Sequence, residues 1–347
     1  MPKRILFIAP SLSSFIRLDI EILEKHFDVT TSIFNWQRKV LTPFLMIAQF
    51  FSVLKAIFIH RVNFIVISFA GYWSFIPSFL GMISNTKVYV IVHGTDACNF
   101  PEIDYGSLRK PILRWVIKRS YEWCYMLLPV SDSLIRSENN YFAGNQPKQI
   151  GVLAEFPNLK LKYTVVPNAF KTEFWTENPV VERSQNVFVT VASDGREVLK
   201  GIDLIVELAR QMPQIKVVVI GMNIFNGDYP SNVHFVGRKT QAELKEYFYR
   251  SQFYFQLSVF EGFGCALCEA MLCGCIPIGS KVNILPEIIG DSGYIVEKRD
   301  IEMLKRCVAG AMGSPKAQAQ GASASQNIKN NYSLKTRENL LLSVLTK

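Results

Sequence analysis

Residues 253–280 read FYFQLSVFEGFGCALCEAMLCGCIPIGS. The apolar run that ends at Val259 predicts a strand, and the glycines after it predict a turn. A helix is expected over about residues 264–273. Backbone N–H groups of such a turn, together with the positive end of the helix dipole, bind phosphate. Glu261 and Glu269 flank the turn, where both could reach hydroxyl groups of a bound nucleotide sugar; a loop with two solvated glutamates is the alternative.

Short apolar runs alternate with helical patterns on both sides of this stretch, first up to YTVVPNA (163–169) and again from residue 187. This alternation predicts α/β architecture with parallel sheets covered on both faces. We expect two doubly wound, Rossmann-like domains, an N-terminal one of residues 1–168 and a C-terminal one of residues 169–332. The last helix, about 333–347, could pack back on the N-terminal domain. Because such sheets bind ligands at the carboxyl ends of their strands, the expected site is the cleft between the domains.

The composition is that of a folded protein with a surplus of positive charge. The 347 residues include 38 Lys and Arg against 29 Asp and Glu, a net charge of +9. Residues 1–170 alone contain 18 basic and 11 acidic residues, so most of the surplus lies in the N-terminal half. A basic surface attracts polyanions, either anionic lipid or nucleic acid. No basic run is interleaved with aromatic residues, and we therefore expect no nucleic acid partner.

Two apolar stretches are long enough to be weighed as membrane spans. Residues 44–59 are interrupted by Gln49, Ser52 and Lys55. Residues 62–86 carry no Asp, Glu, Lys or Arg, but glycines and a proline divide them into a strand and a helix. The sequence therefore predicts two buried elements and no transmembrane helix in residues 62–86, and none in residues 44–59.

The chain is expected in the cytoplasm, with a peripheral position on the membrane face as a further expectation. Seven scattered cysteines suit a reducing compartment, and the first residues show no signal-peptide cleavage pattern. Arg38, Lys39, Lys55 and Arg61 bracket the apolar helix expected near residues 41–60 and could hold the chain on an anionic membrane. An ordinary core helix with solvated ends is the alternative.

Seven motifs, in order along the chain, resemble those of the retaining glycosyltransferases of family four (group 1 glycosyltransferases). The segment EGFGCALCEAMLCGCIPIGS resembles the Glu-x7-Glu segment of that family. The other matches are VIVHGTD (90–96), LLPVSDS (127–133), VVPNAF (165–170), VTVASDGREVLKGIDLIVELA (189–209), VHFVGRKTQAELKEYFYRSQF (233–253) and LPEIIGDSGYIVE (285–297). The resemblance implies the GT-B fold, in which two Rossmann-like domains face each other across a cleft. It also implies transfer of a sugar from a nucleoside-diphosphate sugar to a saccharide or lipid-linked glycan, with retention of anomeric configuration.

The resemblance implies roles for residues of the C-terminal domain. Glu261 would hold hydroxyls of the transferred sugar and Glu269 the ribose, while Arg196 and Lys200 would neutralise the leaving diphosphate. Cations at that point suit the chemistry, because departure of a nucleoside diphosphate builds up negative charge. The backbone amides near the sugar and phosphate would be those of Phe263, Gly264 and Cys265, and Arg238 lies in the segment that contacts the nucleotide.

In the N-terminal domain the resemblance singles out His93 as a contact of the donor sugar or the acceptor. Asp96 would either cap the next segment or receive the acceptor hydroxyl. The loop after the first strand lacks the glycines usual in the family and has Ser11 and Ser13 instead, which could supply hydroxyl donors on the acceptor side. Arg196 lies four residues before Lys200, where the family more often shows five.

We expect no metal site and no cofactor. Cys265, Cys268, Cys273 and Cys275 have a spacing that resembles metal ligands, but they lie among small apolar residues and are predicted to be buried. The chain has no Asp-x-Asp pair that would hold a divalent cation. Two other functions remain open, a sugar-nucleotide epimerase of the same fold and a nucleotide-sugar-binding subunit without catalytic activity.

Overall fold

A computed structural model describes residues 2–36, 38–142, 146–223, 225 and 227–346 of the chain. The chain divides into two compact units. Unit 1 comprises Met1–Ser137, Gln149–Asn168 and Arg337–Lys347, and unit 2 comprises Glu138–Lys148 and Ala169–Thr336.

The core of unit 1 is a parallel sheet with the strand order β2-β1-β3-β4-β5. Its central strands are apolar on both sides, and every residue of β3 is buried. This burial on both faces is the reason for the continuous apolar runs in the sequence. The strands are β1 (Arg4–Ala9), β2 (Asp28–Ile33), β3 (Phe64–Ser68), β4 (Lys87–Val92) and β5 (Met126–Pro129).

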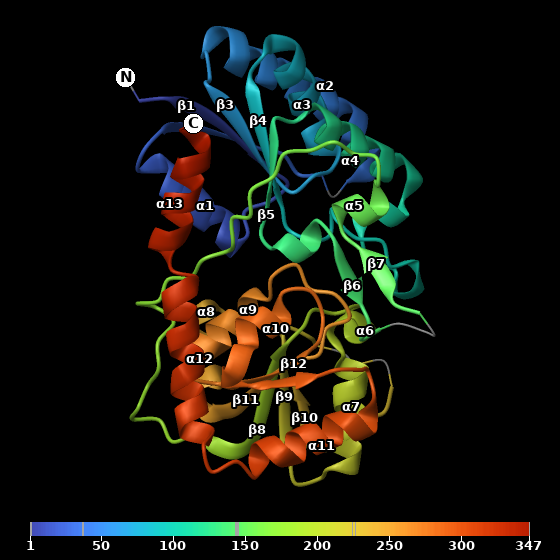
Figure 1. The fold of residues 1–347 in the computed structure, drawn as a ribbon, viewed down its shortest axis with the longest axis vertical. Helices are drawn as coiled ribbons and strands as arrows, with labels where there is room; N and C mark the ends of the chain where they lie inside the picture. Colours follow the sequence, from blue (N-terminus) through green and yellow to red (C-terminus); the bar gives the residue numbers. More distant parts are fainter. Residues whose placement is uncertain (1, 37, 143–145, 224, 226, 347) are drawn as a thin grey trace. The chain divides into compact units, whose positions relative to one another are not determined.

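Helices cover both faces of this sheet (Figure 1). The connection from β1 to β2 runs in the opposite direction to the later ones, so right-handed crossovers place α1 on one face and α2, α3 and α4 on the other. The C-terminal helix α13 lies on the α1 face, where the Tyr89 hydroxyl lies 3.5 Å from the carbonyl oxygen of Val344. The helices are α1 (Ser14–Glu24), α2 (Thr42–Leu54), its π-helical continuation η2 (Lys55–Ile59), α3 (Tyr72–Ser84), α4 (Pro111–Trp123), α5 (Val152–Glu155) and α13 (Leu334–Leu345), with 3-10 turns η1 (Lys39–Leu41), η3 (Pro101–Ile103), η4 (Ser107–Arg109) and η5 (Asp132–Leu134).

Unit 2 contains a parallel sheet with the order β10-β9-β8-β11-β12-β13. Both sheets are doubly wound, as the alternation predicted. The strands are β8 (Ser184–Val191), β9 (Lys216–Ile220), β10 (Val233–Phe235), β11 (Ser251–Gln256), β12 (Ile276–Ser280) and β13 (Tyr294–Val296). The helices are α6 (Glu197–Lys200), α7 (Ile202–Gln211), α8 (Gln241–Arg250), α9 (Cys265–Leu272), α10 (Leu285–Ile289), α11 (Ile301–Met312), α12 (Ala317–Asn331) and the 3-10 turn η6 (Gly290–Ser292).

The structure divides the chain at Asn168 and Ala169, and differs from the expected ranges in residues 138–148, which group with unit 2. These residues contain most of β6 (Ser137–Asn139) and the start of β7 (Lys148–Ile150). Hydrogen bonds connect residues 138–148 to the rest of unit 2. The Asn139 amide donates to the carbonyl of Val259 at 2.7 Å, and Lys298 Nζ donates to the carbonyl of Asn140 at 2.9 Å. No apolar pattern marks this excursion in the sequence.

The stretch 163–169, predicted as a strand, forms only an isolated bridge from Tyr163 to Leu127. It does run beside β5, since Leu127 donates to the carbonyl of Lys162 and Val166 donates to that of Pro129. Pro129 has no N–H to donate in return, and this interrupts the ladder.

The helix from Thr42 to Ile59 is long and apolar enough, by length and composition, to cross a membrane, and 22% of it is buried. Its inner side packs on unit 1: Val53 is fully buried, and the Gln49 amide donates to the carbonyl of Trp73 at 2.8 Å. The second stretch weighed as a span forms β3 and α3, as predicted.

A buried ion pair joins α13 to α1. Arg337 is 2% exposed and Asp19 is completely buried, and two guanidinium nitrogens donate to the Asp19 carboxylate at 2.5 and 2.7 Å. The third nitrogen donates to the carbonyls of Val166 and Pro167. Three segments distant in sequence thus depend on one guanidinium.

Replacing Arg337 by Met should lower the free energy of unfolding by about 3 kcal/mol or more, because the Asp19 charge would remain buried without a partner. Thermal and urea unfolding measure this change. Asp19→Leu combined with Arg337→Met should recover part of the loss. Arg210→Met serves as the control, since Arg210 pairs with Glu207 on the surface. Equal effects of Arg337→Met and Arg210→Met would contradict the assignment.

Candidate functional site

Two loops of unit 2 meet where the strand order reverses, between β8 and β11. In open parallel sheets this is where ligands bind. Lys200 is the last residue of α6, in the loop region after β8, and Glu261 follows β11. Gly201 adopts φ +70°, and a Cβ there would lie 2.3 Å from the carbonyl oxygen of Leu257. Only glycine therefore allows the two loops to approach this closely.

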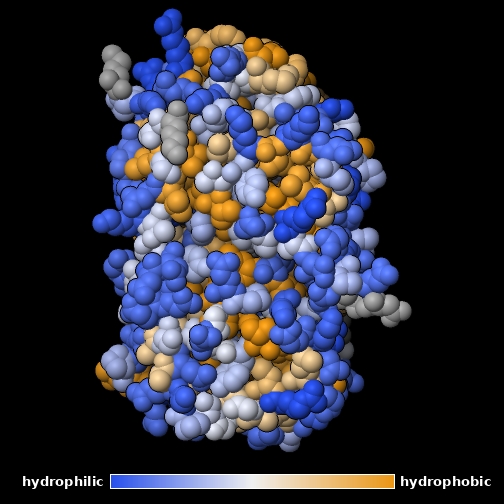
Figure 2. Space-filling view, viewed as in Figure 1, coloured by the Kyte–Doolittle hydropathy of each residue, from blue (hydrophilic) through white to orange (hydrophobic). Residues whose placement is uncertain are grey.

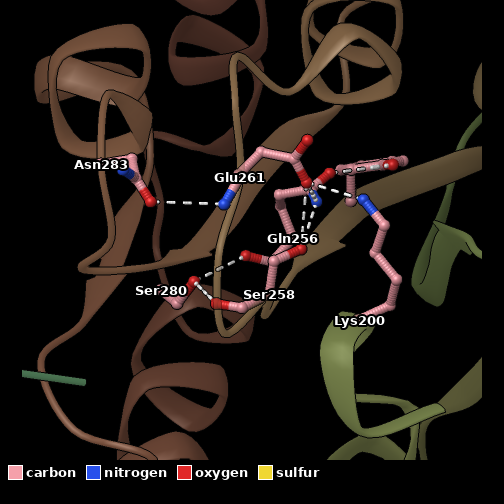
Figure 3. Close-up of polar contacts among 7 residues, drawn as sticks. Lys200, Gln256, Ser258, Glu261, Ser280 and Asn283 are labelled. Atoms are coloured by element: carbon pink, nitrogen blue, oxygen red, sulfur yellow. Dashed lines mark hydrogen bonds and ion pairs between the residues drawn. The ribbon is translucent and has the colours of Figure 1, made fainter. Parts of the chain in front are cut away.

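The carboxylate of Glu261 is the centre of a polar cluster (Figure 3). Its Oε2 atom accepts hydrogen bonds from Lys200 Nζ at 2.7 Å, Gln256 Nε2 at 2.9 Å and Ser258 Oγ at 3.2 Å. The Glu261 N–H donates to Asn283 Oδ1 at 3.3 Å. Ser280 Oγ donates to the carbonyl of Ser258 at 2.6 Å and so fixes the loop from below. The cluster holds a cation and an anion in contact at a partly exposed site.

A pocket of about 420 Å³ opens beside this cluster within unit 2. Lys200 and Arg238 both line it, so the structure brings these two predicted residues together. Ala266, in the first turn of α9, also lines the pocket, which places the positive end of that helix at its wall. The volume lies in the range typical of small-ligand sites. Cationic side chains and a helix N-terminus in one pocket suit an anionic ligand.

The structure places the other predicted residues of the 261–273 segment as follows. Gly264 is the N-cap of α9 with φ +94°, and Cys265 begins the helix. The Phe263 side chain is buried against the rings of Phe170 and Tyr332, so it packs the domain and only its backbone remains for a ligand. Arg196 is the N-cap residue of α6 and is not among the residues that line the pocket.

Glu269 lies in the second turn of α9, and its carboxylate has no hydrogen-bond partner among the described residues. Burial raises its pKa to about 8. A carboxyl group in this state is protonated at neutral pH and can both donate and accept a hydrogen bond, which suits a hydroxyl-bearing ligand.

Three of the four cysteines of the segment are buried as predicted, whereas Cys265, at the start of α9, is half-buried. Cys268, Cys273 and Cys275 are fully buried, and burial raises the pKa of each thiol. Among the described residues, no group of three or more His, Cys, Asp or Glu side chains is arranged to hold a metal ion.

In unit 1, His93 follows β4 and is packed between aromatic rings. Its imidazole centroid lies 4.2 Å from that of Phe69 and 4.9 Å from that of Phe15, and Ser68 Oγ lies 2.9 Å from Nε2. Burial, and then the positive charge of Arg337, lower the pKa of His93 well below its usual range. The imidazole is therefore neutral at physiological pH. Phe69 adopts φ +61°, a strained conformation for a bulky residue, directly beside it.

Asp96 is completely buried. Its carboxylate accepts hydrogen bonds from the backbone N–H groups of Ala70, His93 and Gly94 at 2.8, 3.2 and 2.9 Å. The predicted contact with an acceptor hydroxyl does not fit this placement, and neither does a helix cap. Asp96 instead ties the loop after β3 to the loop that carries His93.

The loop after β1 contains the two predicted serines. Ser11 is exposed. Ser13 is the N-cap residue of α1 but makes no capping hydrogen bond, and its buried hydroxyl has no partner in the part of the chain that the structure describes. Both follow β1, at the carboxyl edge where the strand order of unit 1 reverses.

Comparison with known proteins settles the family of unit 2. Residues 171–328 match the family described as "Glycosyl transferases group 1". This segment is a group 1 glycosyltransferase domain. A relative by sequence is the N-acetyl-alpha-D-glucosaminyl L-malate synthase of Bacillus anthracis, 26% identical over 227 residues. That alignment covers 62% of this chain and 55% of the relative, so the chain matches about half of that protein's length.

Solved structures extend the likeness to the whole chain. The sucrose-phosphate synthase of Thermosynechococcus elongatus superposes with a TM-score of 0.77 at 14% identity, covering 99% of this chain and 98% of that one. Anabaena HepE, crystallised with UDP and glucose, gives a TM-score of 0.72 at 16% identity over 100% of both chains. The chain therefore has the GT-B fold of these glycosyltransferases.

The side chains that hold Glu261 in the glycosyltransferase domain were not predicted from the sequence. Gln256 and Ser258 come from the end of β11 and the loop after it, and Asn283 comes from the turn after β12. The sequence did contain a signal for two of them, because Gln256 and Ser258 are polar residues near the end of an otherwise apolar run. Asn283 also adopts φ +48°, a conformation that asparagine tolerates better than most residues.

Replacing Glu269 by Gln should stabilise the glycosyltransferase domain at alkaline pH. A folded-state pKa above the unfolded value means that wild-type stability falls as pH rises from the unfolded pKa towards about 8. The variant has no such group, so its advantage should grow by about 2 kcal/mol between about pH 6 and about pH 9. Thermal unfolding across this range measures it. The exposed Glu246→Gln is the control, and an advantage of Glu269→Gln that does not change with pH would contradict the prediction.

Proposed function

We propose that the chain is a retaining glycosyltransferase that moves a sugar from a nucleoside-diphosphate sugar to a saccharide or lipid-linked glycan acceptor. The observation that carries the proposal is the contact of Lys200 with Glu261 beside the cationic pocket of the group 1 domain. Two relatives agree with sugar transfer: the N-acetyl-alpha-D-glucosaminyl L-malate synthase, and an O-antigen chain mannosyltransferase of Escherichia coli that is 29% identical over 72 residues. We further propose a role in surface polysaccharide or glycolipid synthesis, in the cytoplasm.

The residues divide the chemistry of transfer between them. Breaking the bond from the anomeric carbon to the diphosphate oxygen leaves negative charge on the diphosphate and positive charge on the sugar. Lys200, Arg238 and the start of α9 would stabilise the diphosphate, and Arg196 is a further cation one helical turn before Lys200. Glu261 would hold sugar hydroxyls, with Gln256 and Ser258 fixing its carboxylate. A carboxylate that its neighbours already hold in position lowers the activation free energy more than one that must be ordered during the reaction.

Glu269 would bind the ribose, and His93 of unit 1 would contact the donor sugar or the acceptor. The neutral imidazole of His93 can donate from one ring nitrogen and accept at the other. Anabaena HepE was crystallised with UDP and glucose, which agrees with a nucleotide-sugar donor. A sugar-nucleotide epimerase of the same fold would need no acceptor, and a binding subunit would release no product.

Glu261→Gln and Lys200→Met should each lower kcat by about a hundredfold or more, because each removes a contact that strengthens in the transition state. The double variant should lose less than the product of the two single effects, since the two side chains act as one unit. Release of free nucleoside diphosphate from a panel of nucleotide sugars measures the rate. The exposed Lys216→Met should retain wild-type activity. A wild-type protein that interconverts nucleotide sugars without releasing diphosphate would favour the epimerase.

Transfer should keep the anomeric configuration and should not need a divalent cation. The pocket's own cations supply the charge that a metal would otherwise provide. We expect activity to survive EDTA largely intact, and proton NMR of the product to give the same anomeric coupling as the donor. Activity that disappears with chelator and returns only with magnesium or manganese would contradict the first expectation. An inverted product would contradict the second.

A further inference from the structure

The outer side of the α2–η2 helix in unit 1 is apolar and exposed. Phe44, Ile47 and Phe51 are 68%, 57% and 64% exposed, and Phe58 and Ile59 in η2 are 65% and 69% exposed. Positions 44, 47 and 51 follow the helical repeat of α2, so these side chains form one stripe, and Phe58 and Ile59 extend the exposed apolar surface into η2. Scattered exposed apolar residues are ordinary in soluble proteins, but a continuous stripe of large ones marks an interaction surface.

The polarity of this helix is inverted relative to an ordinary surface helix. Gln49 is completely buried on its inner side, while the phenylalanines face outward. Gln49 Nε2 donates to the Trp73 carbonyl, which fixes the rotation of α2 about its axis. The exposure of the stripe thus follows from the packing of α2 on α3, and the helix is not a core helix.

The apolar surface continues across the neighbouring helices. On α3, Met82 and Ile83 are exposed, and on α4, Ile112 and Trp115 are exposed. Aromatic contacts join these two helices, with Phe75 and Trp115 centroids 5.4 Å apart. Figure 2 shows apolar residues gathered on the upper part of this face, where Figure 1 places α2, α3 and α4. We call this surface, formed by the exposed apolar residues of α2, η2, α3 and α4, the α2–α4 face.

Positive charge surrounds the α2–α4 face. Between Asp28 and Asp96 the sequence contains no Asp or Glu but five Lys and Arg residues. Lys55 and Arg61, at the two ends of η2, are exposed. Lys118 and Arg119 of α4 share the single carboxylate of Glu122. The face therefore combines large apolar side chains with a basic rim.

We propose that the α2–α4 face docks on the surface of an anionic lipid bilayer, with its phenylalanines at the boundary between headgroups and acyl chains. Aromatic and aliphatic side chains beside basic residues are the composition of helices that lie in the membrane interface. Charge complementarity selects the bilayer over a second copy of the chain, because two such faces would bring their basic rims together. A helix packed along one side on α3 lies on the membrane and does not cross it.

The docking itself does not depend on the proposed function; only the choice of acceptor that follows from it does. A transferase held on the membrane by unit 1 would meet an acceptor that is itself carried by lipid, so the lipid-linked glycan is the acceptor class that the α2–α4 face favours. The binding itself needs no donor or acceptor and can be measured without either.

Flotation of the full chain with vesicles tests the docking. At low salt the protein should float with vesicles of phosphatidylglycerol and phosphatidylcholine and not with phosphatidylcholine alone, and added salt should weaken the binding. Phe44→Gln with Phe51→Gln, and separately Lys55→Glu with Arg61→Glu, should each reduce partitioning by about tenfold or more. Alkaline carbonate should release the bound protein.

Matched controls come from unit 2. Val180→Gln with Tyr229→Gln removes exposed apolar side chains there, and Lys216→Glu with Lys316→Glu reverses exposed charges. Both should float as the wild type does. Circular dichroism and diphosphate release without vesicles should be unchanged in every variant, which separates loss of docking from loss of fold or of catalysis.

Three outcomes would overturn the proposal. The first is absence of flotation with anionic vesicles at low salt, or equal flotation of the wild type and both α2–α4 variants. The second is resistance to carbonate extraction, which would mean that the helix crosses the bilayer. The third is a dimer in sedimentation experiments that the phenylalanine variants abolish while vesicles fail to bind, which would assign the face to a second copy.

Discussion

Parallel strands buried on both faces impose the main constraint on this molecule. Such strands are mostly apolar, so charged side chains gather in the loops at the strand ends. In both units the predicted functional residues follow this rule: Lys200 and Glu261 lie beyond β8 and β11, and His93 lies beyond β4. Lys200 and Glu261 lie where the strand order of their sheet reverses, between β8 and β11, which is where ligands bind in open parallel sheets.

The two units control the state of their polar site residues by different interactions, hydrogen bonds in unit 2 and burial in unit 1. In unit 2, the Glu261 carboxylate accepts hydrogen bonds from Lys200 and from two neutral donors, so its position is fixed before a ligand arrives. In unit 1, burial and the charge of Arg337 keep His93 neutral. Arg337 thus has a second consequence: the guanidinium that joins α13 to α1 also affects the protonation of the imidazole. Structure and electrostatics of unit 1 are coupled through one side chain.

The surface of unit 1 departs from the usual arrangement for a soluble α/β domain. Helices on the outside of such a domain normally turn apolar residues inward, and α1 does so with Ile16, Ile22 and Leu23. In α2 the side chain of Gln49 is enclosed and phenylalanines are exposed. The same unit carries most of the positive charge. An anionic membrane, the partner proposed for the α2–α4 face, would accommodate both the exposed apolar side chains and the basic residues beside them.

The sequence by itself determined the fold class and the strands of both sheets, and the family motifs pointed to Lys200 and Glu261 as residues of one site in unit 2. These features are local or periodic: apolar alternation, glycine at turns, and motifs of fixed spacing. Tertiary structure alone decided the rest. Asp96 lies in a motif that suggested ligand contact, but its burial under three backbone N–H groups makes it a structural residue. Gln256, Ser258 and Asn283 converge on Glu261 from separate segments, and Arg337 finds Asp19 across 318 residues. Which side of α2 faces outward depends on α3, because the sequence of that helix is apolar nearly all round. Such choices depend on contacts between distant segments, which no local pattern encodes.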